Sequence, residues 1–467
     1  METHINTIHN TIAANFTLKS LLRFTLPTVT MMLFMGLYTM VDSILISRFI
    51  GTDGLSALNI ITPVINLIVG FGGMFATGTN AIVARELGEG NTNRASQDFS
   101  LLVITAIVAG IGIAIAGTLW KTSLIQTLGS NKVLFPYCNS YLSVLLFFTP
   151  AAIMQILFQH LLVTAGKPGV GLMVSVGAGI LNILLDILFI VEYKMGIAGA
   201  ALGTGLAYTF PSLVGIAVFI QKDAVLTFCR PIIDFHVIIK SCKNGFSELV
   251  SQSAMAVTTF LFNITMMKLA GETGVAAITI MIYAQFLVTS IYIGFSMGVS
   301  PILSFNYGSH NSPRLTRIFS YSFWIIGIFS GILFICSQLY GPVLVSFFTD
   351  TTSPVYHLAS TGFRIFSSSF LCSGFTIFAS ATFTAFSDWK RSAIISCLRS
   401  FICLVIALML FPRIWQETGV WLAVPFSEFA SLLASLILLH KFRHVYNYCQ
   451  SRHSKPFASP CPHEIKS

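Results

Sequence analysis

Two polar residues interrupt an apolar stretch near the middle of the sequence. Asn182 and Asp186 lie in LNILLDILFI, residues 181–190, where the other eight side chains are apolar. Residues four apart share one face of a helix, so the amide and the carboxyl group would lie one turn apart. A carboxylate near the centre of a bilayer costs roughly 2.5–3.5 kcal/mol on insertion scales. If this helix crosses a membrane, the pair predicts a site for a proton or a cation.

Three more acids lie in apolar stretches. Asp42, in YTMVDSILI, is a second acid in the middle of an expected helix. Glu428 lies about nine residues into the last apolar stretch and is a second-rank candidate for an acid in an internal cavity. Glu248 lies near the cytoplasmic start of its stretch, so a structural role fits it equally well. For all of these acids the alternative is a buried carboxyl group that only bonds to nearby backbone.

The composition is that of a membrane protein. The chain has 467 residues, of which 55% are hydrophobic and 9% are charged, and its mean hydropathy is +0.81. A soluble domain usually carries about 25% charged residues. Twelve apolar stretches approach or exceed the length of about 20 residues that spans a bilayer. They are residues 21–46, 54–80, 97–119, 134–158, 166–191, 196–220, 237–266, 274–300, 317–341, 355–385, 391–412 and 419–441.

The Lys and Arg residues predict how these helices are oriented. With both ends of the chain in the cytoplasm, 19 of the 26 lie on the cytoplasmic side and 7 on the other, which is the bias of the positive-inside rule. Topology therefore accounts for the net charge of +9, and we expect no nucleic-acid binding. Residues 1–20 are polar, so we expect no cleavable signal peptide. The prediction is a multi-pass protein of the cell membrane with both termini cytoplasmic.

The second half of the sequence repeats the first. At an offset of 220, GTDGLSALN (51–59) aligns with GETGVAAIT (271–279) without gaps, and loop residues such as Gly88 and Gly308 are identical. Near the end, 196–205 aligns with 419–428 at an offset of 223. Each half holds six helices, an even number, so both halves keep the same orientation. We expect an all-α membrane protein of two parallel six-helix lobes related by a pseudo-twofold along the membrane normal.

This organisation divides the chain into five parts. They are a cytoplasmic tail (1–20), an N-lobe with helices 1–6 (21–220), a cytoplasmic linker (221–236), a C-lobe with helices 7–12 (237–441) and a cytoplasmic C-terminal tail (442–467). Two lobes with a cleft between them suit transport by alternating access better than they suit a channel.

The mid-helix acids are not repeated between the halves. At the offset of 220, Asp42 aligns with Phe262 and Asp186 with Ile406, so the ionisable chemistry belongs to the N-lobe. Pro27 removes a backbone donor from the first helix and predicts a bend there. Such a bend would move Asp42 relative to Asp186, and we expect their carboxyl groups to share one hydrogen-bond network.

The motifs resemble those of one transporter family. Pro27 and Asp42 in the first helix, VARELGEGN after the second, and LNILLDILFI followed by GIAGAALGTGLAY are similar to the multidrug and toxic compound extrusion (MATE) family. The resemblance covers about residues 20–440. It implies a cation-coupled antiporter that exports amphipathic, often cationic compounds.

The resemblance also implies an ion site. It assigns the coupling ion to Asp42, Asn182, Asp186 and Thr204 in the N-lobe, and small-residue faces on the fifth and sixth helices would bring Thr204 close. Some relatives have an acidic site in the C-lobe instead, but the tenth helix here, GFTIFASATFTAF, has no acid. Oxygen ligands suit both H⁺ and Na⁺, so the coupling ion stays open. We expect a monomer that binds small molecules and membrane lipid.

Two other functions fit the sequence less well than export. A flippase for a lipid-linked sugar diphosphate would need a basic cavity, and only Arg364 is a plausible basic residue within a span. An intramembrane enzyme would need a catalytic or metal motif such as HExxH. The ten histidines form no ligand cluster and the nine cysteines form no CxxC motif. We therefore expect neither enzymatic activity nor a cofactor.

Overall fold

The computed structural model describes residues 11–221 and 224–448, and all elements in these ranges are helical. Nine helices there are long and apolar enough to cross a membrane, or ten if a bent pair counts as one span. The chain is therefore a multi-pass membrane protein.

The α-helices are α2 (Leu18–Phe49), α3 (Thr52–Gly88), α4 (Thr92–Thr127), α5 (Phe135–Phe147), α6 (Thr149–Thr164), α7 (Pro168–Asp186), α8 (Ile197–Ile220), α9 (Phe235–Gly308), α10 (Ser312–Ser346), α11 (Pro354–Phe366), α12 (Phe370–Ala385), α13 (Trp389–Cys397) and α14 (Cys403–Phe442). Three short π or 3-10 segments join them, namely η1 (Ile187–Glu192), η2 (Ser367–Ser369) and η3 (Leu398–Ile402).

Helix α9 folds back on itself. A Cβ atom built on Gly78 of α3 would lie 2.1 Å from the carbonyl oxygen of Ser241, and one on Gly88 would lie 2.1 Å from that of Phe305. Residues 241 and 305 of a straight helix would be about 96 Å apart at 1.5 Å per residue. The break is at Gly271, whose φ of 61° is in the left-handed region that glycine adopts without strain.

The last long helix reverses in the same way. Arg399 of η3 donates a hydrogen bond of 2.9 Å to Glu428 of α14, although 29 residues of straight helix would separate them by about 43 Å. The non-helical residue is Gln416, with φ 49° and ψ −126°. Both reversals fall between two apolar stretches of the sequence.

One expected span is sharply bent. The stretch 134–158 was expected to be one helix, but α5 and α6 meet at Phe148 with a bend of 55°. Pro150 has no N–H to donate to the Leu146 carbonyl four residues earlier, which favours a break here. In contrast, α2 continues without a break across Pro27.

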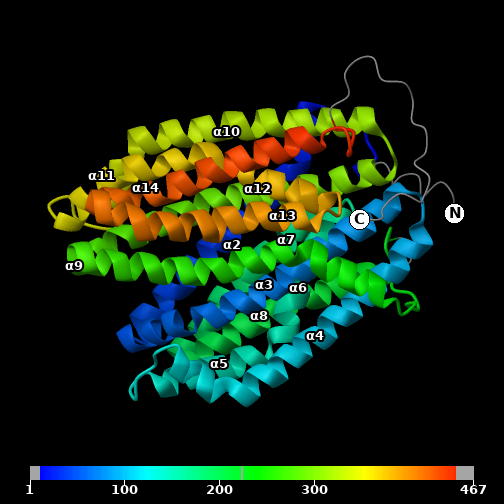
Figure 1. Cartoon of the computed structure of the whole chain (residues 1–467). Helices are drawn as coiled ribbons and strands as arrows, with labels where there is room; N and C mark the ends of the chain where they lie inside the picture. The colour runs from blue at the N-terminus through cyan, green and yellow to red at the C-terminus, as the bar shows by residue number, and fades with distance from the viewer. Residues whose placement is uncertain (1–10, 222–223, 449–467) are drawn as a thin grey trace.

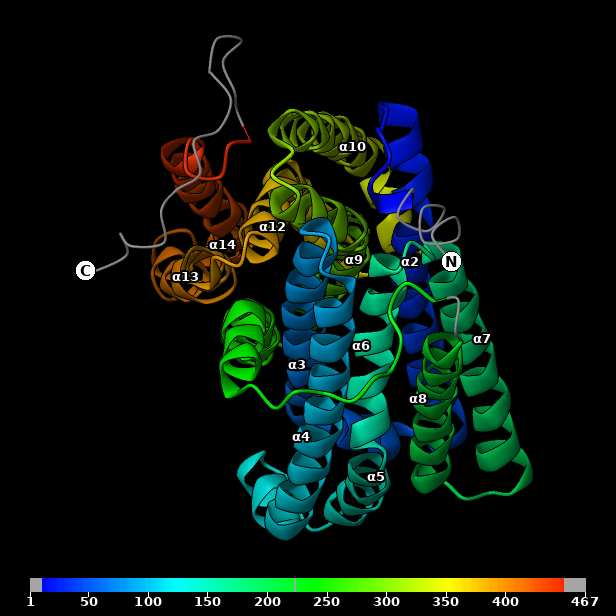
Figure 2. The ribbon, with the colours of Figure 1, turned by 90° about the vertical axis from the view of Figure 1, so that its right-hand side faces the viewer.

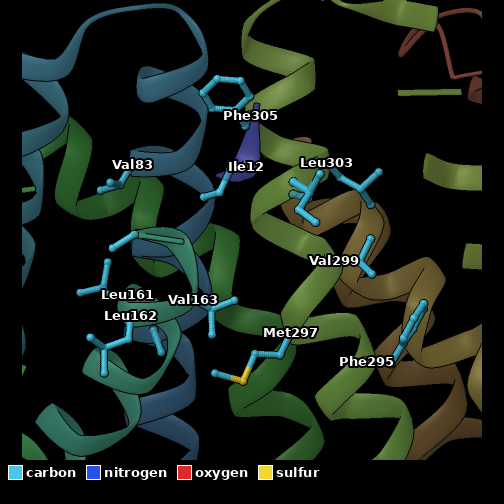
Figure 3. Packing of buried hydrophobic residues seen from close by; sticks show 14 of the residues in the cluster. Ile12, Val83, Leu161, Leu162, Val163, Phe295, Met297, Val299, Leu303 and Phe305 are labelled. Carbon is cyan, nitrogen blue, oxygen red and sulfur yellow. The ribbon is translucent and has the colours of Figure 1, made fainter. Parts of the chain in front are cut away.

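The helices form two groups that α9 connects. Figure 1 shows α10 to α14 together above α9 and α3 to α8 mostly below it, and Figure 2 shows the same division from the end. The largest apolar cluster contains residues of both groups. In Figure 3, Val83 of α3 and Leu161 of α6 lie across from Phe295 and Val299 of α9.

Both described ends of the chain lie at one end of the bundle. Arg314, in the first turn of α10, donates to the Asn15 side chain at 2.7 Å. Phe319, five residues later, packs on Tyr448 with ring centroids 4.6 Å apart. Ends on the same side require an even number of crossings.

Candidate ion site and family

Asp42 and Asp186 lie together in the N-lobe, as their motifs predicted. The two carboxyl groups lie close enough to interact electrostatically, and both side chains are buried, Asp186 completely. Asp42 lies in the second half of α2, and Asp186 is the last residue of α7, where the π-helical turns of η1 begin. Single π turns inside α-helices occur frequently at functional sites.

Asn182 and Thr204 complete the predicted group. The Asn182 amide donates to the Thr204 hydroxyl at 3.5 Å, so α7 and α8 are joined beside the acids. The close approach depends on Gly203, because a Cβ atom there would lie 2.2 Å from Asp186 Oδ1. The small-residue face of GIAGAALGTG thus brings α8 against the acid.

Three tyrosines and a glutamine surround the acids and were missed from the sequence. Tyr38, Tyr141 and Tyr208 all interact electrostatically with Asp42, and Gln155 of α6 interacts with Tyr38. The spacing of residues in the sequence could have predicted two of these four side chains. Tyr38 precedes Asp42 by four residues and Tyr208 follows Thr204 by four, so each shares a helical face with a site residue.

The acids have no counter-charge among the described residues. Both Asp186 oxygens and one Asp42 oxygen are buried without a hydrogen-bond donor, and no described salt bridge includes either residue. Two carboxylates can hydrogen-bond to each other only if a proton lies between them, because both are otherwise acceptors. The same oxygens, with the Asn182 carbonyl and the Thr204 hydroxyl, are ligands that suit Na⁺. The site can therefore take up a proton or a monovalent cation.

The second-rank acids lie elsewhere. Glu428 accepts hydrogen bonds from Thr376 at 2.8 Å and from Arg399 at 2.9 Å, in a group of helices separate from the Asp pair. Glu248 accepts a bond of 3.2 Å from Gln252 and lies against Gly73 of α3. Neither acid joins Asp42 and Asp186.

Arg399 is a second basic residue within an apolar helix that the sequence did not single out. The positive-inside count places it on the cytoplasmic side, and Arg364 is predicted to be the basic residue within a span. In the structure Arg364 is exposed, while Arg399 is largely buried and paired with Glu428. Its charge is compensated by that acid, so it does not create the basic cavity that a flippase needs.

Comparison with known proteins finds relatives that are named as multidrug export proteins. The multidrug export protein MepA of Staphylococcus saprophyticus is 22% identical over 434 residues, which cover 91% of this chain and 94% of the relative. MepA of Staphylococcus aureus strain MRSA252 is also 22% identical, over 442 residues with the same coverage.

Solved structures share the fold. A crystal structure of MATE in complex with MaL6 matches with a TM-score of 0.89 at 20% identity, covering 95% of this chain and 99% of that one. An outward-facing multidrug resistance MATE family transporter of the MOP superfamily matches with a TM-score of 0.87 at 20% identity, covering 93% and 98%.

A family model decides the assignment. The model described as MatE matches this chain twice, over residues 27–188 and 249–409, which together make up more than half of the sequence. The chain belongs to the multidrug and toxic compound extrusion (MATE) family.

Proposed function

We propose that the protein is a secondary active multidrug efflux transporter of the cell membrane. It exchanges inward H⁺, or alternatively Na⁺, for outward amphipathic or cationic compounds by alternating access. The observation that carries the proposal is the buried pair Asp42 and Asp186, which has no counter-cation among the described residues. An acid that costs several kcal/mol to bury points to an ion or proton path. The MepA relatives, named as multidrug export proteins, support the choice of cargo.

The pair provides a means of coupling. Loading one proton or cation neutralises one of two like charges that face each other in a buried site. Releasing it restores their repulsion and favours a rearrangement of α2 relative to α7. Exporting a monovalent cation against the membrane potential costs roughly 2.3 kcal/mol per 100 mV, and one incoming proton cancels that cost.

The architecture we propose has twelve spans in two six-helix lobes related by a pseudo-twofold. Counting the two folded helices, broken at Gly271 and Gln416, as two spans each turns ten candidate spans into twelve. The double match of one family model, once in each half, supports the repeat. The even number of crossings agrees with cytoplasmic placement of both termini and of the 221–236 linker. We expect the monomer to contain the complete pathway.

The conformation we propose is outward-facing. The close contacts between α3 and α9 extend from Gly70 to Gly88, in the half of α3 nearest the chain ends. Asp42 lies in the half of α2 that is farther from the chain ends. Asp186, the last residue of α7, lies on the same side of the bundle as Asp42. With the chain ends cytoplasmic, the lobes are closed toward the cytoplasm.

Efflux from vesicles tests the proposal. The purified full-length protein is reconstituted, loaded with a fluorescent cation such as ethidium, and exposed to a pH gradient or a Na⁺ gradient imposed separately. We expect one of the two gradients to drive efflux and the Asp186→Asn variant to lose it. Absence of efflux under both gradients, with correctly inserted protein, would refute the proposed function.

A further inference from the structure

A second buried charge cluster lies in the C-lobe. Glu428 accepts hydrogen bonds from Arg399 at 2.9 Å and from Thr376 at 2.8 Å, and its side chain is 3% exposed. The positive charge of Arg399 also acts on Glu248 of α9, which accepts a bond from Gln252. One guanidinium therefore interacts with two carboxylates, one fixed in a buried ion pair and one beside it.

The helix is locally distorted at Arg399. Residues 398–402 form the π segment η3, and the Arg399 carbonyl oxygen accepts a bond of 2.7 Å from the Ser427 hydroxyl. Ser427 is the repeat partner of Thr204 at the offset of 223. Glu428 thus adjoins the repeat partner of one site residue, whereas the repeat partners of Asp42 and Asp186 are the apolar Phe262 and Ile406, and the C-lobe cluster includes a cation.

Glu248 faces the other lobe. A Cβ atom on Gly73 of α3 would lie 2.4 Å from Glu248 Cγ, and the residue is partly exposed. Its carboxylate therefore lies at the lobe interface, where alternating access opens the path for a compound. Glu428, by contrast, is held away from water by Arg399 and Thr376.

We infer that Arg399 sets the number of positive charges that the exported compound carries. With Glu248 and Glu428 ionised, the cluster has a net charge of −1, which matches a monovalent organic cation. The inference rests on the proposed function, because it concerns the compound and not the coupling ion. Removing the guanidinium leaves two carboxylates and a net charge of −2, which favours dications. Removing Glu428 instead leaves an acid and a base that neutralise each other.

A charge ladder, which is a set of variants in which the net charge of the cluster is 0, −1 or −2, tests the inference. The Kd values of tetraphenylphosphonium, a monocation, and dequalinium, a dication, are measured on full-length protein in nanodiscs. An added negative charge acts twice on a dication and once on a monocation, so Arg399→Gln should shift the affinity ratio toward dequalinium by about five- to tenfold. Arg399→Gln/Glu428→Gln restores −1 and should return the ratio to that of the wild type. Glu428→Gln alone should weaken binding of both cations and shift the ratio the other way.

Controls separate this inference from the proposed function. Arg364→Gln removes an exposed arginine of the same lobe and should leave the ratio unchanged. Asp186→Asn should abolish coupled efflux and tests the proposed function alone. If Arg399→Gln does not fold, the Glu428→Gln variant still tests one step of the ladder. A wild type that exports cations while the ratio stays constant across the ladder would overturn the inference and leave the proposed function intact.

Discussion

Gly88 of α3 lies directly against the backbone of Phe305 in α9, where an added Cβ atom would stand 2.1 Å from the carbonyl oxygen. The reciprocal contact is also present, since a Cβ atom on Gly308 would stand 2.2 Å from the carbonyl oxygen of Arg85. Residues 88 and 308, and likewise 85 and 305, are partners at the repeat offset of 220. The two glycines thus hold α3 and α9 together through matching contacts at positions related by the sequence repeat.

Gly88→Ala should weaken this closure. A methyl group cannot fit 2.1 Å from a carbonyl oxygen, so the lobes must separate at this end. We expect spin labels on cysteines introduced at exposed positions 89 and 309, in a background without the native cysteines, to report longer distances than in the unsubstituted protein. Gly112→Ala, where the added atom meets nothing within 4 Å, is the control. An unchanged distance distribution would show that the glycine does not control the closure.

Asp186→Asn should abolish coupled efflux without preventing membrane insertion. The amide keeps the size of the carboxyl group but cannot exchange a proton, and removing a buried acid lowers the cost of insertion. Initial rates of efflux under the driving gradient should fall to the level of protein-free vesicles. Insertion is checked by the yield of monodisperse protein extracted from membranes. Near-normal efflux by this variant would remove Asp186 from the coupling mechanism.

Gly203→Ala should impair coupling, although Gly203 is not a predicted ligand and only precedes the predicted ligand Thr204. The added Cβ atom would lie 2.2 Å from Asp186 Oδ1, so the carboxyl group or α8 must move. We expect the efflux rate to fall by about tenfold or more, since small displacements at a site are costly. Gly169→Ala in α7, with open space around the added atom, should retain activity. Equal activities of the two variants would contradict the close fit.

The proximity of Asn182, Asp186 and Thr204 could be predicted from the sequence because side-chain chemistry and helical spacing are local. Asn182 and Asp186 had to share a face, and the glycines next to Thr204 predicted close packing. Tyr141 could not be found in this way, because it reaches the acids from a different helix through tertiary packing. The pairing of Arg399 with Glu428 was missed for the same reason, since it depends on the reversal at Gln416.

The topology predicts one-sided labelling. With cytoplasmic termini, Lys194 lies in an external loop between η1 and α8. A cysteine introduced at position 194, in a background without the native cysteines, should react with a membrane-impermeant maleimide added outside intact cells. A cysteine at position 310, in the loop after α9, should react only after permeabilisation. The reverse pattern would invert the proposed orientation.

Tyr446→Phe should destabilise the end of the C-lobe. The Tyr446 hydroxyl donates to Asp388, which also pairs with Arg391, so the substitution leaves a buried carboxylate with one donor fewer. The expected loss is about 1–3 kcal/mol, seen as a lower melting temperature in detergent. Tyr193→Phe, at an exposed tyrosine, is the control.

The effect of Tyr446 should also depend on pH. Burial, with the hydrogen bond to Asp388, raises the pKa of Tyr446 above its ordinary value of 10.0. A raised pKa means that the stabilisation is complete below about pH 10 and is lost as the pH rises above it, because the unfolded chain then ionises first. The stability difference between the wild type and Tyr446→Phe should therefore stay constant from pH 7 to about 9 and shrink above pH 10. A difference that grows with pH above 10 would mean that the hydroxyl is already ionised in the folded protein.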